Sequence, residues 1–300
     1  MTALTVARAA NAAPSARLTS PVALIVGGSA GIGQAIAYKL AQYSDTPHII
    51  ISSRSQRSAE VTLKRLQEIN GSGKYEFIAT DMTQLKSINN LIQSIQDRLS
   101  TLNFLIISSG ALTTGGRVET EDGIERKMAL NYYGRFYLMH GLAPLLQQTG
   151  NQPDQEARVM SVLNAGRGGN IHFDDLELKK TYSFKAVRDT GGAFNDMMAE
   201  EFSIRYPKVA WMHTYPGFVD TDIMANLPWF LRYPGKILYM FYGIKPEDCG
   251  DYLWHGFHLQ ERKTGWYLLD EKGDTISKRS YHTDEARKIV WDHSIALLKL

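Results

Sequence analysis

Three glycines between an apolar run and a helical pattern have the types and spacing to bind a phosphate group. Gly27, Gly31 and Gly33 follow the run ALIV and precede the amphipathic stretch QAIAYKLAQ. Glycine lets a backbone turn tightly and approach a pyrophosphate, whose charge is met by the free N–H groups at the start of the next helix. An ordinary tight turn is the alternative, but the strand before these glycines and the helix after them favour dinucleotide binding.

The residues after the second apolar run indicate which dinucleotide is bound. An acidic residue there would bond the ribose 2′-hydroxyl of NAD and repel the 2′-phosphate of NADP. This chain has the neutral Ser53 followed by Arg54, with Arg57 close behind, and a guanidinium binds a phosphate through two parallel hydrogen bonds. The sequence therefore predicts NADP as the cofactor, and two solvated arginines at the start of a helix are the alternative.

Short apolar runs alternate with longer helical patterns, which predicts right-handed βαβ units on a parallel sheet. The expected strands span Val22–Val26, His48–Ser52, Tyr75–Ala79, Phe104–Ser108, Arg158–Val162, Val209–Thr214 and Trp266–Leu269. The expected helices span Gly33–Tyr43, Ala59–Asn70, Lys86–Leu99, Asp122–Leu146, Gly192–Tyr206 and Pro246–His258. We therefore expect an α/β fold, a doubly wound parallel seven-stranded sheet of the Rossmann type, in a single domain over 21–300.

The spacing Gly-x-x-x-Gly-x-Gly resembles the short-chain dehydrogenase/reductase family, and the resemblance covers nearly the whole chain. Further motifs that carry it are Asp81 in ATDM, Gly110 closing ISSG, Asn131 in NYYGRFYL and the segment PGFVDT. The resemblance implies that the cofactor is bound by Gly27, Ser29, Gly31, Ile32, Gly33, Ser53, Arg54, Asp81, Met82, Ser109, Gly110, Pro216, Gly217, Val219 and Thr221. The long helix at 122–146 and an insert at 227–243 are most similar to the retinol-dehydrogenase-like branch, and we also expect a fungal secondary-metabolism subgroup.

The catalytic pattern of that family is degenerate here. Its members move the substrate proton with a Tyr, whose pKa is lowered by a Lys four residues later. Counting back from PGFVDT places the Tyr position on Arg188 and the Lys position on Gly192, and none of the 15 tyrosines has a Lys at the fourth position after it. The family's substrate-positioning Ser falls on Leu163 and Asn164. The usual proton-transfer pair is therefore absent from the sequence.

Four polar residues are candidates to replace the missing groups, and each has a plainer structural explanation. Asn164 has an amide that can hold a substrate carbonyl or an oxyanion. Tyr182, three residues before Lys185, could reach the nicotinamide if the preceding loop folds back. Asp189 could orient a substrate, or simply favour a helix start through the dipole. Asn131 matches the family's helix Asn, and bonding of a local backbone carbonyl is its alternative.

Three functions remain open at this point. The first is an oxidoreductase that moves a hydride between NADP(H) and a carbonyl or imine of a bulky apolar small molecule, covered by an insert at about 225–245. The second is a redox-neutral isomerase, dehydratase or cyclase on the same fold, since orientation alone accelerates reactions. The third is a protein that binds the cofactor without turnover.

Composition limits the remaining classes of function. The 300 residues are 44% hydrophobic and carry a net charge of +2, so we expect a full core and no nucleic-acid partner. The single cysteine, Cys249, and the lack of zinc-type spacing predict a reducing, cytoplasmic location without a metal. Residues 1–20 form either a leader segment over the domain or an organelle transit peptide. We expect no spanning helix, although the aromatic stretch 227–243 could touch a membrane surface. A homodimer is an assembly that the resemblance implies.

Overall fold

In the computed structural model, which describes residues 2–221, 239, 243–259 and 261–300, eight strands form one sheet. The strands are β1 Val22–Val26, β2 His48–Ser53, β3 Lys74–Ala79, β4 Phe104–Ile107, β5 Ala157–Val162, β6 Val209–Thr214, β7 Gly265–Leu269 and β8 Thr275–Ile276. Their order across the sheet is β3-β2-β1-β4-β5-β6-β7-β8. The first seven strands are parallel, and β8 pairs antiparallel with β7.

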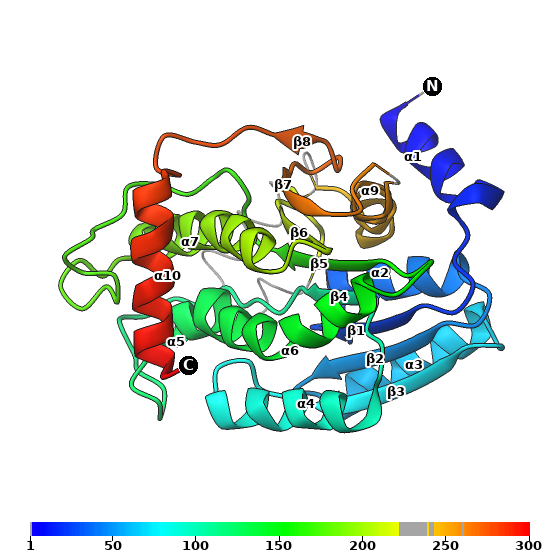
Figure 1. Cartoon of the computed structure of the whole chain (residues 1–300), viewed down its shortest axis with the longest axis horizontal. Coiled ribbons are helices and arrows are strands. Elements are labelled where there is room, and N and C mark those ends of the chain that lie inside the picture. The colour runs from blue at the N-terminus through cyan, green and yellow to red at the C-terminus, as the bar shows by residue number, and fades with distance from the viewer. Residues whose placement is uncertain (1, 222–238, 240–242, 260) are drawn as a thin grey trace.

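Helices cover both faces of the sheet, which is why the central strands read as continuous apolar runs. Their bounds are α1 Ala3–Asn11, α2 Gly31–Gln42, α3 Gln56–Ile69, α4 Leu85–Arg98, α5 Arg126–Met128, α6 Gly134–Gly150, α7 Phe184–Arg205, α9 Pro246–His258 and α10 Asp284–Leu298. Figure 1 shows α4, α6 and α7 in front of the sheet and α2 and α3 behind it. Every residue of β5 and β6 is buried between these layers.

The strand order reverses between β1 and β4, which are neighbours although two other strands separate them in the chain. The helices after β1 and after β4 therefore leave the sheet on opposite faces and open a crevice at the carboxyl ends of the strands. In doubly wound sheets, ligands bind in this crevice. The fold thus places the glycine-containing turn after β1 where a ligand would enter.

The structure confirms the α/β class and the parallel sheet but corrects the expected details. The sheet has an eighth strand, β8, which is only two residues long and therefore has no hydrophobic pattern of its own. Helix α7 begins at Phe184 and not at Gly192, because Ser183 caps it by accepting from the N–H of Ala186. The C-terminal helix α10 was not expected, although Thr283 caps it in the same way.

The helix expected over 122–146 is instead three consecutive segments. After α5 comes a π-helical turn, Ala129–Tyr133, and then α6, which runs on to Gly150. Single π-helical turns widen a helix by one residue and often lie at functional sites. This turn contains Asn131, one of the four residues expected to act in catalysis.

Helix α10 crosses α6 and α7 on the outer side of the molecule (Figure 1). Trp291 packs against Phe136 and Phe202, with ring centroids 4.8 and 5.0 Å apart, and Ser294 bonds the buried hydroxyl of Tyr132 at 2.7 Å. The sequence resemblance would place α6 and α7 at a dimer axis. Part of that face is already covered by the chain's own C-terminal helix.

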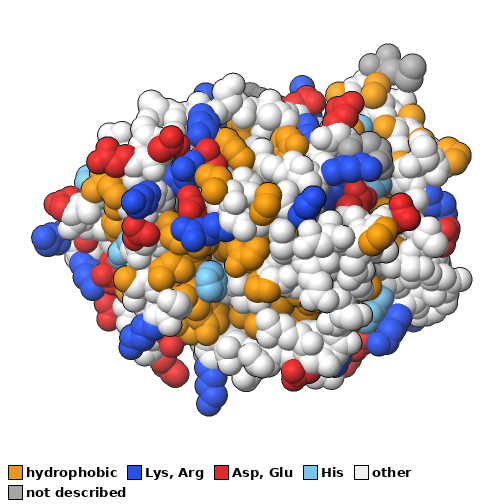
Figure 2. All heavy atoms as spheres, viewed as in Figure 1, with side chains coloured by type: hydrophobic (Ala, Val, Ile, Leu, Met, Phe, Trp, Pro, Cys, Tyr) orange, Lys and Arg blue, Asp and Glu red, His pale blue; other side chains and the backbone are white. Residues whose placement is uncertain are grey.

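The N-terminal segment is ordered against the domain. Helix α1 packs on α9, where Arg8 bonds Asp248 and Asp251 at 2.6 and 2.8 Å and Asn11 donates to the carbonyl of Asp251. The insert expected at 225–245, including the aromatic stretch 227–243, lies almost wholly outside the described residues. Among the helices that the structure describes, none is long and apolar enough to cross a membrane. Figure 2 shows basic and acidic side chains mixed over the visible face.

Candidate cofactor cleft and catalytic region

A cleft of about 870 Å³ opens at the carboxyl ends of β1, β2 and β4. Most of the residues expected to bind a cofactor line it: Gly27, Ser29, Gly31, Ile32, Ser53, Arg54, Asp81, Met82, Ser109, Gly110 and Thr221. Four others, Gly33, Pro216, Gly217 and Val219, do not line it. The structure therefore brings segments from five different parts of the chain to one site.

The three glycines each meet a different physical requirement. Gly27 has a φ of +83°, and a Cβ there would lie 2.5 Å from the backbone nitrogen of Ser109. A Cβ on Gly33 would lie 2.4 Å from the carbonyl oxygen of Gly27. Gly31 begins α2 with a φ of +57°, and the preceding Ala30 has no side chain able to cap the helix. The N–H groups of the first turn of α2 are thus left for an anion.

Two buried hydroxyls in the cleft indicate whether its lining fits a bound ligand. Ser109 Oγ and Thr80 Oγ1 both belong to residues that line the cleft, and neither has a hydrogen-bond partner among the described residues. A buried polar atom without a partner is costly, so native proteins normally satisfy such groups through protein, water or ligand atoms. A polar ligand such as a dinucleotide fits this lining.

The charged end of the cleft is provided by Arg54. Its side chain is exposed, lines the cleft, and makes no ion pair or hydrogen bond with the described residues. Arg57 lies one residue inside α3 and does not line the cleft. The sequence alone did not separate the two arginines, and their positions on either side of the α3 cap do so.

Asp81 and the 216–221 segment approach the cleft from opposite sides. One carboxylate oxygen of Asp81 accepts from the N–H and the hydroxyl of Thr83, at 2.9 and 2.8 Å, which orients the side chain. Gly217 has a φ of +77°, and Thr221 Cγ2 would lie only 3.1 Å from a Cβ on Gly31. The segment after β6 therefore returns to the start of α2.

The residue at the expected Ser position occupies space beside α7. A Cβ on Gly192 would lie 2.8 Å from both amide atoms of Asn164. The Asn164 Nδ2 donates to the carbonyl of Arg188 at 3.2 Å, while Oδ1 is buried with no partner among the described residues. One of the two N–H groups of the amide is therefore used, and Oδ1 is an acceptor left to bind. The role expected for Asn164 in catalysis stays a prediction.

The positions of the missing Tyr and Lys hold no equivalent groups. The side chain of Arg188 is mostly exposed and bonds Asp189 at 3.0 Å, while Lys185 bonds the other oxygen of Asp189. Burial raises the pKa of Asp189, but hydrogen bonds from Lys185 and Arg188 outweigh this and lower it overall. Asp189 is therefore an ionised acceptor held by two cations, and it has no proton to give at neutral pH.

Tyr182 has a lysine partner, but a different one from that expected. Its hydroxyl accepts from Lys127 Nζ at 2.6 Å and donates to the carbonyl of Gly116 at 3.1 Å. Lys185 points instead to Asp189, one helical turn later. The expected pairing was wrong because Tyr182 precedes the Ser183 cap and does not lie on α7. A Tyr–Lys contact thus exists, built from the loop before α7 and from α5.

Asn131 lies near the same part of α7. Its backbone carbonyl accepts from Asn195 Nδ2 at 2.8 Å, and its Cβ would be 3.7 Å from a Cβ on Gly191. Because α7 carries glycines at 191 and 192, the half-buried Asn131 side chain approaches the helix backbone closely. Asn131 and Asn164 therefore flank the two glycines.

Sequence reasoning did not find Lys127 or the buried Arg135. Arg135 is fully buried, and it donates to the carbonyls of Ser109 and Val162 at 2.6 and 2.9 Å and to Ser161 Oγ at 2.7 Å. Burial lowers its pKa to about 9. A guanidinium inside an apolar helix face is a signal that could have indicated its role, which is to tie together the ends of β4 and β5.

Comparison with known proteins agrees with this arrangement. Residues 21–183 match the model of the family described as short chain dehydrogenase. An oxidoreductase of Emericella nidulans is 29% identical, over 99% of this chain and 98% of its own. Human polyprenol dehydrogenase is 26% identical, over 91% of this chain and 83% of its own. The RhlG/NADP complex of Pseudomonas aeruginosa has the same fold, with a TM-score of 0.64 at 20% identity, over 90% of this chain and all of that one. The chain therefore belongs to the short-chain dehydrogenase family.

Proposed function

We propose that this protein is an NADP(H)-dependent oxidoreductase that acts on a bulky apolar small molecule. One observation carries the proposal: the cleft combines the uncapped start of α2 with buried hydroxyls and an arginine after β2 that have no partner among the described residues. These groups match the pyrophosphate, the ribose hydroxyls and the 2′-phosphate of one dinucleotide. When bound, the nicotinamide supplies or accepts the hydride exchanged with a carbonyl or imine carbon.

Preference for NADP rests on charge. Arg54 lines the cleft and has no acidic partner in the described part of the chain, and the neighbouring Ser53 is neutral, so a dianionic phosphate would gain a charge-assisted bond. The Asp81 oxygen that Thr83 does not occupy is available to accept from the adenine amino group. The arrangement supports binding along the cleft from Asp81 and Arg54 to the start of α2.

The proton for the reaction has two sources in this proposal, Tyr182 and solvent. The phenol oxygen of Tyr182 accepts a hydrogen bond from the ammonium of Lys127, which orients the hydroxyl for proton transfer. Asp189 does not fill this role because two cations keep it ionised. The part of Asn131 and Asn164 is to orient the reacting group beside the glycines of α7.

Two observations support an apolar substrate. Polyprenol dehydrogenase is named for a long apolar alcohol, and Phe218, close to the cleft residue Thr221, is exposed. We extend the proposal to a substrate of this kind, an apolar alcohol or the carbonyl compound derived from it. The expected cover, at 225–245, lies outside the described residues.

A redox-neutral activity is the second candidate. Two features of α7 favour it. Arg188 and Gly192 replace the family's proton-transfer pair, and Asn164 fills the space that a side chain on Gly192 would need. Such an enzyme would orient its substrate and use no hydride. The same replacements in α7 are compatible with a protein that binds the cofactor without turnover. Cofactor binding without turnover is therefore the third outcome that the experiment distinguishes.

The experiment measures binding and turnover separately. NADPH is titrated by its fluorescence, and absorbance at 340 nm follows NADP⁺ with apolar alcohols and NADPH with the matching aldehydes and ketones. Coenzyme-dependent product formation supports the proposal, and product formed without change in NADPH would support the redox-neutral function. Tyr182→Phe and Lys127→Met should slow turnover with little change in NADPH affinity, whereas Lys185→Met is the matched control.

A further inference from the structure

A buried chain of hydrogen bonds runs from the segment before α10 to the end of β5. The hydroxyl of Tyr281 donates to Asp196 Oδ2 at 2.6 Å, and Asp196 Oδ1 bonds His213 Nδ1 at 2.5 Å. The Nε2 of His213 accepts the backbone N–H of Asn164 at 3.2 Å. Asp196 and His213 are fully buried. The chain connects α7, β6 and the C-terminal segment to one loop.

The hydrogen-bond partners fix the tautomer of His213. A backbone N–H can only donate, so Nε2 must carry a lone pair and the ring proton lies on Nδ1. That proton is donated to Asp196, whose carboxylate also accepts from Tyr281 and, at 3.1 Å, from the N–H of Gly166. Three donors from three segments therefore satisfy one buried carboxylate, as a buried charge requires.

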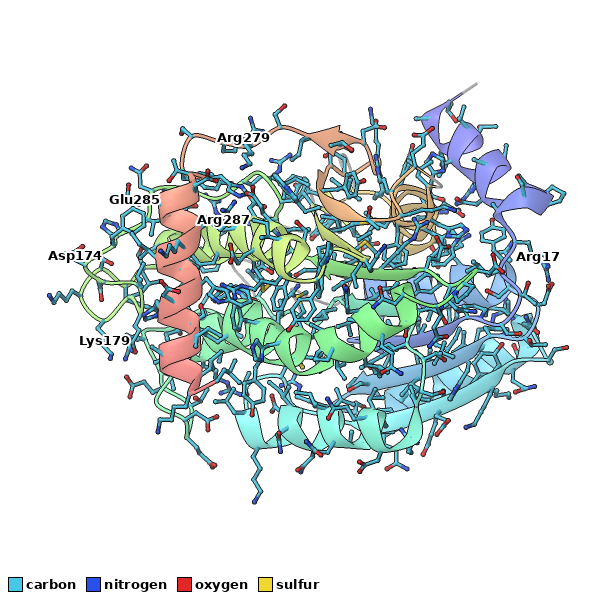
Figure 3. All side chains as sticks on the ribbon, in the orientation of Figure 1. Arg17, Asp174, Lys179, Arg279, Glu285 and Arg287 are labelled. Atoms are coloured by element: carbon cyan, nitrogen blue, oxygen red, sulfur yellow. The ribbon has the colours of Figure 1, made fainter. Side chains whose placement is uncertain are left out.

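The same chain of hydrogen bonds, together with Arg279, holds the loop that follows β5. Tyr281 accepts from the N–H of Gly168 at 3.1 Å, and Arg279 donates to the carbonyl of Gly166 at 2.9 Å. Figure 3 shows Arg279 on the segment between β8 and α10. Gly166 has a φ of +66°, a conformation that glycine adopts without strain. Residues 164–168 are thus fixed at several points by groups distant in sequence.

Within the described part of the chain, this loop has one buried side-chain atom without a hydrogen-bond partner. Asn164 Nδ2 is bonded to the carbonyl of Arg188, but Oδ1 is buried against Gly192 and accepts nothing from the described residues. A buried carbonyl oxygen without a donor is destabilising. The hydrogen bonds of Tyr281, Asp196 and His213 therefore hold Asn164 Oδ1, an acceptor without a partner among the described residues, in place beside α7.

We propose that Tyr281, Asp196 and His213 are positioning residues that fix Asn164, so that its Oδ1 accepts a hydrogen bond from the bound ligand. The donor is a hydroxyl or amide N–H, found either on the cofactor or on an alcohol substrate. This inference rests on the proposed function. It gives the C-terminal segment, through Tyr281, a direct influence on the catalytic region.

The test compares the hydrogen-bonded residues Tyr281, Asp196 and His213 with a matched pair whose carboxylate lies one turn further along α7. Glu200 on α7 bonds the buried His282, which precedes α10, at 2.7 Å. The two also form a buried carboxylate–histidine pair, but neither residue bonds the 164–168 loop. Asp196→Asn, His213→Gln and Tyr281→Phe are the test variants, and Glu200→Gln and His282→Gln are the controls. Tyr281→Phe removes a single hydroxyl and keeps the inference testable if the other two variants fail to fold.

Two readouts are measured on each variant of the full chain. The first is hydrogen exchange of the backbone amides of Asn164, Gly166 and Gly168 by NMR. The second is ligand binding, as NADPH affinity by fluorescence and as the separate kcat and KM for an apolar alcohol. The test variants should lose amide protection and lose about tenfold to hundredfold in affinity or kcat, because small displacements of a positioned group are costly. The controls should change neither the protection of these amides nor ligand binding.

Asn164→Leu identifies the donor. A loss of roughly twofold to tenfold in NADPH affinity assigns it to the cofactor, whereas an equal rise in KM for the alcohol at unchanged NADPH affinity assigns it to the substrate. If both stay unchanged, or if the test variants lose protection without any change in binding or kcat, the inference is wrong. A wild-type protein that binds no NADPH contradicts the proposed function and the ligand half of this inference, while the exchange data still decide whether the chain holds Asn164.

Discussion

Among single residues, the cations near the cleft differ in whether they are available to bind a charged ligand or already stabilise the fold. Arg54 lines the cleft without an acidic partner in the described part of the chain, while Lys185 and Arg188 are both bonded to Asp189. A cation that already has a carboxylate partner gains less from a ligand anion than an unpaired one. The consequences of the proposed function are therefore sharpest at Arg54 and at the glycines of the first turn.

Arg54→Ala should weaken NADPH much more than NADH. Only NADPH has the 2′-phosphate, and a hydrogen bond to a charged group contributes about 1.5–3 kcal/mol, which is roughly a tenfold to hundredfold change in affinity. Calorimetric titration of both coenzymes measures the ratio. Arg57→Ala is the control, since Arg57 does not line the cleft. Equal losses for the two coenzymes would show that Arg54 is only a solvated residue before α3.

Gly31→Asp should abolish NADPH binding while the protein still folds. It adds a negative charge at the start of α2, where the free N–H groups would meet the pyrophosphate. Gly31 has a φ of +57°, so Gly31→Ala is the matched control that adds the same backbone strain, about 1–2 kcal/mol, without the charge. Binding is measured by NADPH fluorescence and folding by thermal melting. Unchanged affinity in Gly31→Asp would contradict the placement of the pyrophosphate.

At the scale of elements, α7 carries two adjacent glycines in different surroundings. Gly192→Ala should destabilise the protein, because its Cβ would lie 2.8 Å from both amide atoms of Asn164, and overpacking costs about 1–3 kcal/mol. Gly191→Ala should instead stabilise it by up to about 1 kcal/mol through helix propensity, because its nearest contact is an ordinary 3.7 Å. Urea unfolding of both variants measures the difference. Similar values for the two would contradict the position of Asn164.

The loop between β5 and α7 should contribute stability that depends on pH. Burial raises the pKa of Asp175, but the N–H groups of Thr181, Lys180 and Lys179 and the Thr181 hydroxyl outweigh this and lower it to about 2. A lowered carboxyl pKa stabilises the fold above the unfolded pKa of about 4, and this stability is lost as the pH falls toward 2. Asp175→Asn should flatten thermal stability between pH 4 and 2. A wild-type-like pH profile in that variant would contradict this.

At the scale of the whole molecule, the single cysteine reports opening of the fold. Cys249 is fully buried at the start of α9, and burial raises its pKa to about 12. A thiol reagent should therefore label it only through unfolding. NADPH at about 100 times its Kd should slow labelling roughly a hundredfold, since it binds the folded state alone. Rapid labelling of the native protein, or labelling that NADPH leaves unchanged, would oppose this, and Cys249→Ser is the blank.

Three features could be predicted from the sequence: the parallel α/β sheet, the glycine-containing turn after β1 and the absence of the family's Tyr–Lys pair. These features are local: a strand, a turn and a helix follow one another within about 20 residues, and each has its own periodicity or turn chemistry. The location of most cofactor candidates at one cleft follows from the same pattern, because the carboxyl ends of parallel strands meet at one edge. Helix α10 was equally local, and its cap at Thr283 could have revealed it.

The polar groups that meet in the catalytic region could not be predicted without the three-dimensional fold. Lys127 and Tyr182 are 55 residues apart in the chain, and Tyr281 and Asp196 are 85 apart. No periodicity relates residues so distant, because their contact depends on how loops close and on the rotation of α7 over the sheet. A shift of the start of α7 from Gly192 to Phe184 was enough to give Lys185 and Tyr182 different partners. The physical reason is that side-chain direction changes by about 100° with each helical residue.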